Sequence, residues 1–246
     1  MNRDDELSRI RKAADAYGSD ELAGANELYH LHVRDTLIPA EGGGTALELG
    51  CGKGLWTSVL CERYDRVDVV DGSEYLLENV RGENESRRAE IAVHHALVED
   101  FIRETRGRWV HIYLSFLLEH LSDPVTVLKG IRRLLDTGGR LFVAVPNALS
   151  VHRMVAQRMG MIDRPDELSE NDKRVGHRRL YTPLLLRSHL LDAGYDIIEL
   201  STITLKPLSL GQMREWPTEL VRAFCESGDL APMHGAYIIT QATPRP

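Results

Sequence analysis

From residue 45 onward, short apolar runs of strand length alternate with longer amphipathic stretches. This alternation is typical of a parallel sheet whose strands are connected by helices packed on both of its faces. One helix is expected to begin at Pro124, because Asp123 before it is a capping residue and proline fits the first helical turn. Further helices are expected near Leu55 and Tyr75, and strands at 45–49, 67–70, 91–93, 110–115 and 141–145. The pattern therefore predicts a doubly wound α/β fold.

The first 40 residues have a different pattern. They are polar, with apolar positions at helical spacing, and Gly18 and Gly24 predict breaks between two or three short helices. We expect residues 1–40 to form a helical cap on a core at 45–146, within a single domain of 246 residues.

Two further segments interrupt the alternation after the fifth predicted strand. Residues 147–181 have no strand pattern and are predicted to be an insertion that serves as a lid. Residues 182–246 are predicted to complete the sheet, with strands at 197–200 and 236–240 on either side of a second insertion. Open α/β sheets bind ligands at the carboxyl ends of their strands, so both insertions are expected there.

Charge and cysteine content narrow the class of partner. The net charge of −7 argues against binding to a phosphate backbone, which usually needs a basic stripe. No apolar run approaches the roughly 20 residues of a membrane helix. The cysteines lack metal-ligand spacing and suit a reducing compartment; they are Cys51, Cys61 and Cys225. We expect a cytoplasmic protein with a small-molecule substrate, without a nucleic-acid or membrane partner.

A glycine-rich turn, Gly50-Cys51-Gly52-Lys53-Gly54, follows the first predicted strand and opens a helix. Glycine lets the backbone bend tightly and lets a ligand approach without a Cβ in the way. Dinucleotide-binding turns have the spacing G-x-G-x-x-G, which places a pyrophosphate at the helix N-terminus. Here the third glycine comes one residue earlier, which disfavours a nicotinamide dinucleotide.

Asp71 closes the second predicted strand and is followed by Gly72 and Ser73. A carboxylate at this place can accept hydrogen bonds from both hydroxyls of a ribose. An aspartate at a strand end is also a common turn former, but its combination with the glycine turn favours a bound nucleoside.

Several segments together resemble the class I S-adenosylmethionine-dependent methyltransferases, in order and at matching intervals: ALELGCGKG, VDVVDGS, ALVEDF and YLSFLLEHLSDP. The likeness continues through GGRLFVAVPNALSVHR and GHRRLYTP, which resemble a subgroup that acts largely on small molecules. The resemblance implies a Rossmann-like, seven-stranded, mostly parallel sheet whose last strand is antiparallel. It also implies that the core at 45–146 binds the cofactor. His111 departs from the family pattern, which usually has Asp at the start of the fourth strand.

The resemblance also implies a cofactor, S-adenosyl-L-methionine, with S-adenosyl-L-homocysteine as the product. Glu48 would face the cationic amino group of the cofactor, and Leu97, Val98 and Glu99 would flank its adenine. The complete predicted cofactor set is Glu48, Gly50, Cys51, Gly52, Gly54, Asp71, Gly72, Ser73, Leu97, Val98, Glu99 and Ser115.

The sulfonium is already an activated methyl donor, so transfer depends mainly on aligning the nucleophile, the methyl carbon and the sulfur. A general base matters only if the acceptor must lose a proton. Phe116 is a candidate to face the sulfonium, with a core aromatic as the alternative. His120 is the candidate for a base or an acceptor-orienting group, with a helix-packing histidine as the alternative.

Polar residues near the first insertion are candidates for acceptor binding, although exposed loop positions would explain them equally. An arginine there could bind a carboxylate or phosphate on the acceptor. Tyr29 is a further candidate to line the lid. The predicted acceptor set is Tyr17, Glu119, Asn147, His152, Arg153, His177, Arg178 and Tyr181.

Other functions remain open at this point. An NAD(P)-dependent oxidoreductase on a similar fold is disfavoured by the glycine spacing, and a non-catalytic S-adenosylmethionine-binding protein would keep the same turn. A nucleic-acid or protein methyltransferase is a further alternative. The acidic charge and the lack of an Asn-Pro-Pro-Tyr motif argue against the amino-directed nucleic-acid enzymes. No metal is expected, because His94 and His95 are adjacent on a strand and point to opposite faces. A homodimer is left open.

Overall fold

The computed structural model describes residues 3–18, 23–82 and 89–246. The described residues form a seven-stranded sheet in the order β3-β2-β1-β4-β5-β7-β6. Only β7 runs against its neighbours, because it pairs antiparallel with both β5 and β6. The predicted sheet with an antiparallel last strand is therefore confirmed. The strands are β1 (Thr45–Leu49), β2 (Arg66–Asp71), β3 (Glu90–His95), β4 (Trp109–Ser115), β5 (Leu135–Pro146), β6 (Tyr195–Ile203) and β7 (Tyr237–Pro244).

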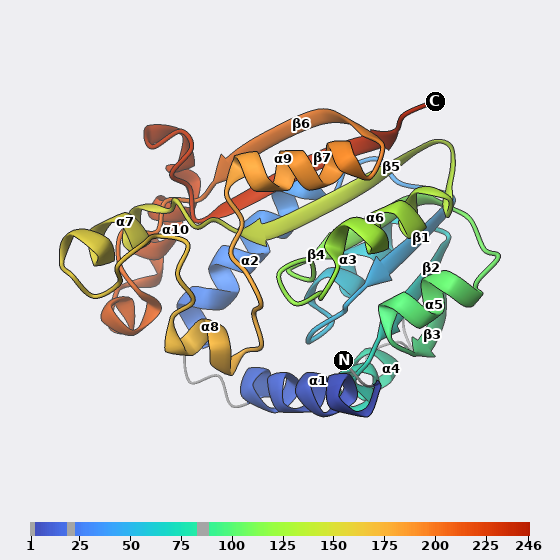
Figure 1. The fold of residues 1–246 in the computed structure, drawn as a ribbon, viewed down its shortest axis with the longest axis horizontal. Helices are drawn as coiled ribbons and strands as arrows, with labels where there is room; N and C mark the ends of the chain where they lie inside the picture. Colours follow the sequence, from blue (N-terminus) through green and yellow to red (C-terminus); the bar gives the residue numbers. More distant parts are fainter. Residues whose placement is uncertain (1–2, 19–22, 83–88) are drawn as a thin grey trace.

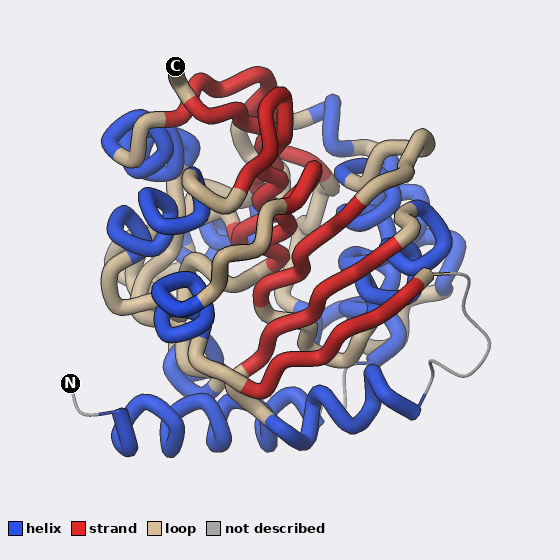
Figure 2. The backbone as a smooth tube through the Cα atoms, turned by 90° about the vertical axis from the view of Figure 1, so that its right-hand side faces the viewer, coloured by secondary structure: helices blue, strands red, loops and turns tan. Residues whose placement is uncertain are grey.

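Helices cover both faces of the sheet, as Figures 1 and 2 show. Successive strand residues point to opposite faces, so neighbouring residues Ala46 and Leu47 of β1 belong to separate buried clusters. One cluster packs against α2 (Ala23–Leu37), α3 (Leu55–Arg63), α4 (Glu74–Gly82) and α10 (Thr218–Glu226). The other packs against α5 (Val98–Glu104), α6 (Pro124–Arg132) and α9 (Pro183–Asp192).

The helix ends follow the capping residues of the sequence. Asp123 accepts a hydrogen bond from Thr126 N at 3.0 Å, and α6 begins at Pro124 as predicted. The prediction that Gly24 breaks a helix is wrong, because α2 begins at Ala23 and continues through it. A glycine near a helix end costs less than one in the interior, because the first turn has fewer backbone hydrogen bonds to lose.

The helix α1 (Arg3–Gly18) lies across the carboxyl ends of the central strands, along the lower edge of the sheet in Figure 2. Its Ile10 packs against Gly72, the residue that follows β2. Its Arg9 donates to the carbonyl oxygen of His120, which lies in the loop after β4. α1 therefore covers the edge at which a parallel sheet binds its ligands.

Both irregular segments also begin at this edge. The first holds α7 (Val151–Arg158) and α8 (Glu170–Arg174), and the second holds η2 (Leu210–Met213), α10 and η3 (Gly228–Leu230). They are joined to each other, because His152 N donates to Lys206 O at 3.1 Å. The second insertion was expected at the carboxyl ends of the strands alone. Its helix α10 instead packs on α2, so this insertion also covers part of one face of the sheet. Among the described residues, no helix combines the length and the apolar character needed to cross a bilayer.

Candidate active site

A cavity of about 490 Å³ opens at the carboxyl ends of β1, β2 and β4. Its wall comes from the glycine turn, from the loops after β2, β3 and β4, and from α1 and α2. Cavities of this size suit a drug-sized or cofactor-sized ligand. The cavity therefore brings together segments that are far apart in the chain.

The glycine turn forms one side of the cavity and needs its glycines. Gly50, Gly52 and Gly54 have φ angles of 79°, 51° and 81°, in the region that residues with a Cβ rarely adopt. A Cβ on Gly50 would lie 3.1 Å from Leu117 Cδ1, whereas a Cβ on Gly52 would meet no atom within 4 Å. The open space at Gly52 lets a ligand contact the backbone directly.

Asp71 lines the same cavity and points toward the glycine turn. Its two carboxylate oxygens accept hydrogen bonds from Cys51 N at 3.1 Å and from Ser73 N at 2.8 Å. Burial raises the pKa of Asp71, and the backbone donors partly offset that rise. Oδ2 is also 3.7 Å from Cys51 Sγ, whereas Ser73 N is the one donor to Oδ1 among the contacts described, so Asp71 can hold the turn in place and still accept from a ligand hydroxyl.

Glu48 and Ser73 lie beside the cavity without forming part of the wall described by the structure. Glu48 is fully buried, and its Oε2 accepts from Thr57 Oγ1 at 2.6 Å. Ser73 N is the donor to Asp71. Their cofactor contacts stay predictions. Each residue is bonded to a neighbour of the glycine turn, Glu48 to Thr57 of α3 and Ser73 to Asp71.

The adenine end of the predicted site is formed by the loop after β3. Leu97, Val98 and Glu99 all line the cavity, and Leu97 and Val98 are buried. Ile10 of α1 lies close to Leu97 around Gly72. The cavity wall here is therefore apolar with one carboxylate beside it, and the adenine contact stays a prediction.

An aromatic group forms the cavity wall after β4. Ser115 and Phe116 both line the cavity, and Phe116 has a φ of 55°, which is uncommon for a bulky residue. Its ring stacks on His30 of α2 with centroids 4.4 Å apart and meets the Tyr237 ring edge at 5.2 Å. The Phe116 ring is therefore part of the cavity wall and also packs against the buried cluster that contains Tyr237, so its contact with the sulfonium stays a prediction.

His120 also lines the cavity. Its Nδ1 lies 3.2 Å from Gly176 O, so the carbonyl selects the tautomer with the proton on Nδ1. Burial, together with the nearby His177, lowers the pKa of His120 to about 3. The imidazole is therefore neutral at physiological pH.

Glu119 precedes His120 but is completely buried and does not reach the described cavity wall. Burial raises the pKa of its carboxyl to about 7, against the opposing influence of His177. No other described residue donates a hydrogen bond to either of its side-chain oxygens. A buried carboxylate in this state is costly, which makes it a candidate for function.

Three charged side chains fasten α1 over the cavity. Glu6 pairs with Arg9 at 2.5 Å and with Arg178 at 2.7 Å. Arg9 also donates to Gly176 O at 2.6 Å, and Arg178 donates to His120 O at 2.9 Å. Burial raises the pKa of Glu6, but the two arginines outweigh it and the net pKa is lowered. Arg178 therefore joins α1 to the loop that carries His120.

Asn147 and Tyr181 lie at the two ends of the first insertion and bridge to each other through the backbone. Asn147 Nδ2 donates to Gly235 O at 2.8 Å, and its Oδ1 accepts from Leu149 N at 3.0 Å. Tyr181 is fully buried with its hydroxyl 3.3 Å from His189 Nδ1. Neither belongs to the described cavity wall, so both brace the insertion where it leaves the sheet.

Arg153, His152 and His177 lie inside the first insertion and outside the described cavity wall. Arg153 is buried, with Nη1 3.1 Å from Asp172 Oδ2 and Nε donating to Pro165 O at 2.6 Å. Burial lowers the pKa of His152 well below its usual value. His177 Nδ1 lies 3.2 Å from Asp172 Oδ1. Arg153 and His177 thus lie on either side of one carboxylate, that of Asp172, within the insertion.

Tyr17 belongs to α1, but its side chain lies outside the described residues. Tyr29 is fully buried and donates to Leu205 O at 3.2 Å, so it connects α2 to the second insertion. Glu6, Arg9 and His30 line the cavity and were missed by sequence reasoning. Polar residues on an amphipathic helix give no sign of which one faces a site, so nothing in the sequence singled them out.

This combination of sheet order, reversed β7 and glycine turn after β1 defines a Rossmann-like methyltransferase fold. The family described as a methyltransferase domain matches residues 25–200. The chain belongs to that family.

Curated relatives carry the name ubiquinone biosynthesis O-methyltransferase. The protein of that name from Xanthomonas oryzae pv. oryzae (strain PXO99A) is 28% identical over 105 residues, 43% of this chain and 44% of the relative. The one from Pseudomonas paraeruginosa (strain DSM 24068 / PA7) is 23% identical over 169 residues, 68% of this chain and 71% of the relative. The match to the first of these relatives thus spans less than half of its length.

Solved structures with the same fold include the DhpI–SAM–HEP complex, with a TM-score of 0.62 and 15% identity over 99% of this chain and all of the other. A methyltransferase from Mesorhizobium loti has a TM-score of 0.59 and 15% identity, covering 89% of this chain and 99% of its own. At these identities the likeness concerns the fold.

Proposed function

We propose that this protein transfers the methyl group of S-adenosyl-L-methionine to a small-molecule acceptor. The observation that carries the proposal is the cavity of about 490 Å³ in which the glycine turn and Asp71 face each other. A nucleoside fits there with its ribose at Asp71 and its chain along bare backbone at Gly52. S-adenosyl-L-homocysteine leaves the same site as product.

The remaining wall supports the same placement of the cofactor. Leu97 and Val98 provide an apolar slot for the adenine, and Glu99 provides a carboxylate for its edge. Ser115 ends β4 and Phe116 follows it. With the ribose at Asp71, the sulfonium and its methyl group would lie beside these two residues. An aromatic face beside a sulfonium is favourable, because the ring quadrupole attracts a cation.

The acceptor is proposed to lie between Phe116 and His120. A neutral imidazole at the cavity wall can orient an acceptor hydroxyl by accepting its hydrogen bond, while the lowered pKa of His120 makes it a weak proton acceptor. An oxygen acceptor is the first to test, since the curated relatives are named as O-methyltransferases. Amine and carbon acceptors are tested next.

The proposal is tested first by binding. Isothermal titration of the full chain with S-adenosyl-L-homocysteine is expected to show stoichiometric binding, while NADH shows none. Binding of NADH alone would favour the oxidoreductase alternative and contradict the proposal.

Turnover separates an enzyme from a non-catalytic binding protein. The protein is incubated with S-adenosyl-L-methionine and a panel of phenols, amines and carbon acids, and formation of S-adenosyl-L-homocysteine is measured. Acceptor-dependent product is expected with at least one hydroxyl compound. Cofactor binding without product across such panels would support the non-catalytic alternative.

A further inference from the structure

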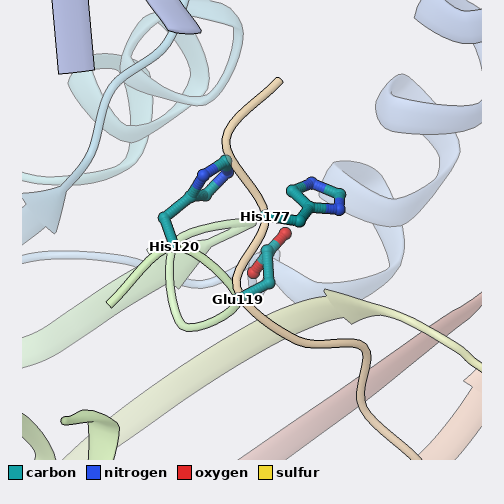
Figure 3. A group of neighbouring side chains, drawn as sticks. All are labelled: Glu119, His120 and His177. Atoms are coloured by element: carbon teal, nitrogen blue, oxygen red, sulfur yellow. The ribbon is translucent and has the colours of Figure 1, made fainter. Parts of the chain in front are cut away.

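We propose that Glu119, His120 and His177 form a binding site for a divalent first-row transition-metal cation, with Zn²⁺ as the representative ion. Each of these side chains offers one ligand atom, and the atoms all lie within 4.8 Å of one another. Figure 3 shows the three side chains gathered where the loop after β4 meets the end of the first insertion.

The carboxylate of Glu119 is the first reason to expect a cation. It is fully buried, and no other described residue donates a hydrogen bond to either side-chain oxygen. Buried carboxylates are normally paired, hydrogen-bonded or bound to a metal. The two imidazoles beside it supply nitrogen lone pairs, the usual ligands of zinc.

The second reason is the surroundings of the histidines. A histidine that ligates a metal usually directs its other ring nitrogen to a carboxylate or a backbone carbonyl, which fixes the tautomer. His120 Nδ1 lies 3.2 Å from Gly176 O, a hydrogen bond that leaves Nε2 as the ligand atom of the neutral ring. His177 Nδ1 lies 3.2 Å from Asp172 Oδ1, close enough for an ion pair but without the geometry of a hydrogen bond, and it would need a small rotation to make one.

The ligand set indicates the class of ion. Two imidazoles and one carboxylate suit Zn²⁺, Fe²⁺, Mn²⁺ or Co²⁺, whereas Mg²⁺ prefers oxygen ligands in an octahedron. Zinc ligands at about 2.1 Å from the ion stand roughly 3.4 Å apart, so the three side chains would move together slightly on binding.

The position of the site suggests what the cation does. His120 lines the cavity, so the open coordination positions of a three-ligand site would face the acceptor end. His120 would then orient an acceptor oxygen through the cation, which also lowers the pKa of a coordinated hydroxyl. The proposal replaces the sequence-based expectation of no metal. Its three ligands are outside the set of residues predicted to bind the cofactor.

The test is direct titration of chelator-treated full-length protein with Zn²⁺ alone. Stoichiometric binding and a rise in melting temperature are expected, with Mg²⁺ giving neither. Glu119→Gln and His177→Gln are each expected to weaken Zn²⁺ binding by at least about 10-fold. The matched control is His95→Gln, because His95 is an exposed histidine outside this cluster that lies beside the carboxylate of Glu74 and could bind zinc adventitiously.

A purely structural role would give a different pattern. Without metal, Glu119→Gln is expected to melt at the same temperature as the unmodified protein or higher, because it removes an unpaired buried carboxylate. Co²⁺ is expected to give a d–d absorption spectrum that His177→Gln abolishes, which decides the matter if the Glu119 variant fails to fold.

The proposal is overturned if Zn²⁺ does not bind, or if binding survives Glu119→Gln and His177→Gln; loss in His95→Gln would then place the ion on the exposed histidine. Titration with S-adenosyl-L-homocysteine in the presence of chelator is run on the same samples. Cofactor binding there, without zinc binding, would overturn the metal site and leave the proposed function standing.

Discussion

The two ends of the cavity are built in different ways. At the cofactor end, Asp71 accepts hydrogen bonds from the backbone amides of Cys51 and Ser73, and residues at the carboxyl ends of neighbouring strands and in the loops after them complete the wall. At the acceptor end, His120 lies among side chains from α1, the loop after β4 and the first insertion. Glu6 and Arg178, which join these segments, are 172 positions apart.

This difference explains what each end can do. A site made of backbone groups at the end of a strand is held in place by the sheet itself. Such a site suits a cofactor that stays the same whatever the acceptor is. A site made of side chains from insertions can change its substrate without disturbing the sheet. The following substitutions test whether the two ends are separable, beginning with the largest expected effect.

His120→Gln is expected to lower kcat by about 10²- to 10⁴-fold, the range for a lost proton-accepting or orienting group. Its affinity for S-adenosyl-L-homocysteine is expected to stay within about threefold, because the cofactor end is held by other residues. Steady-state kinetics with an acceptor from the turnover panel, together with calorimetry, measure both. His234→Gln, an exposed histidine bonded to Leu149 O, is the control. An unchanged kcat in His120→Gln would contradict the assignment.

Asp71→Asn is expected to weaken S-adenosyl-L-homocysteine binding by about 100-fold. The amide turns one acceptor into a donor, and a buried hydrogen bond left unmade costs about 1–3 kcal/mol before any ribose contact is lost. The matched control is Asp68→Asn on the same strand, whose carboxylate bonds to Arg66, His94 and Trp109. Asp68→Asn should lower stability but leave cofactor affinity within about threefold. Equal losses in the two variants would show that Asp71 acts only on stability.

Gly52→Ala is expected to weaken S-adenosyl-L-homocysteine binding by about 10-fold, because the new methyl group occupies space that the ligand needs. Gly138→Ala is the control, since Gly138 also has a positive φ, of 78°, and its Cβ would likewise meet no atom within 4 Å. Each alanine should cost about 1–2 kcal/mol of stability from left-handed backbone. An equal loss of S-adenosyl-L-homocysteine affinity in Gly138→Ala would show that the effect at Gly52 comes from backbone strain and not from lost ligand space.

Glu6→Gln is expected to have the smallest effect, speeding release of S-adenosyl-L-homocysteine by about two- to fivefold. Partly exposed ion pairs contribute up to about 1 kcal/mol, and this one holds α1 across the cavity. Stopped-flow release rates are compared with those of Glu74→Gln, whose exposed carboxylate pairs with Arg81 on the same helix, α4. Identical release rates would show that α1 does not restrain the ligand.

The sequence was sufficient for the sheet and for placing the glycine turn and Asp71 at one edge of it, because strand alternation and the glycine turn are local patterns; the cofactor contacts of these residues stay predictions. Capping residues such as Asp123 even located the start of a helix. The acceptor end was predicted less well. Asn147 and Arg153 are polar residues in an insertion, and only the structure shows that they bond to the insertion itself. Arg9 and His30 gave no signal, because their place at the cavity depends on how α1 and α2 pack.

The central claim is that a nucleoside lies along the glycine turn with its ribose on Asp71. A crystal structure with S-adenosyl-L-homocysteine tests it most directly. Both ribose hydroxyls should lie within hydrogen-bond distance of the Asp71 carboxylate, with the sulfur beside Phe116. A ligand bound elsewhere, or a ribose without contact to Asp71, would contradict the account.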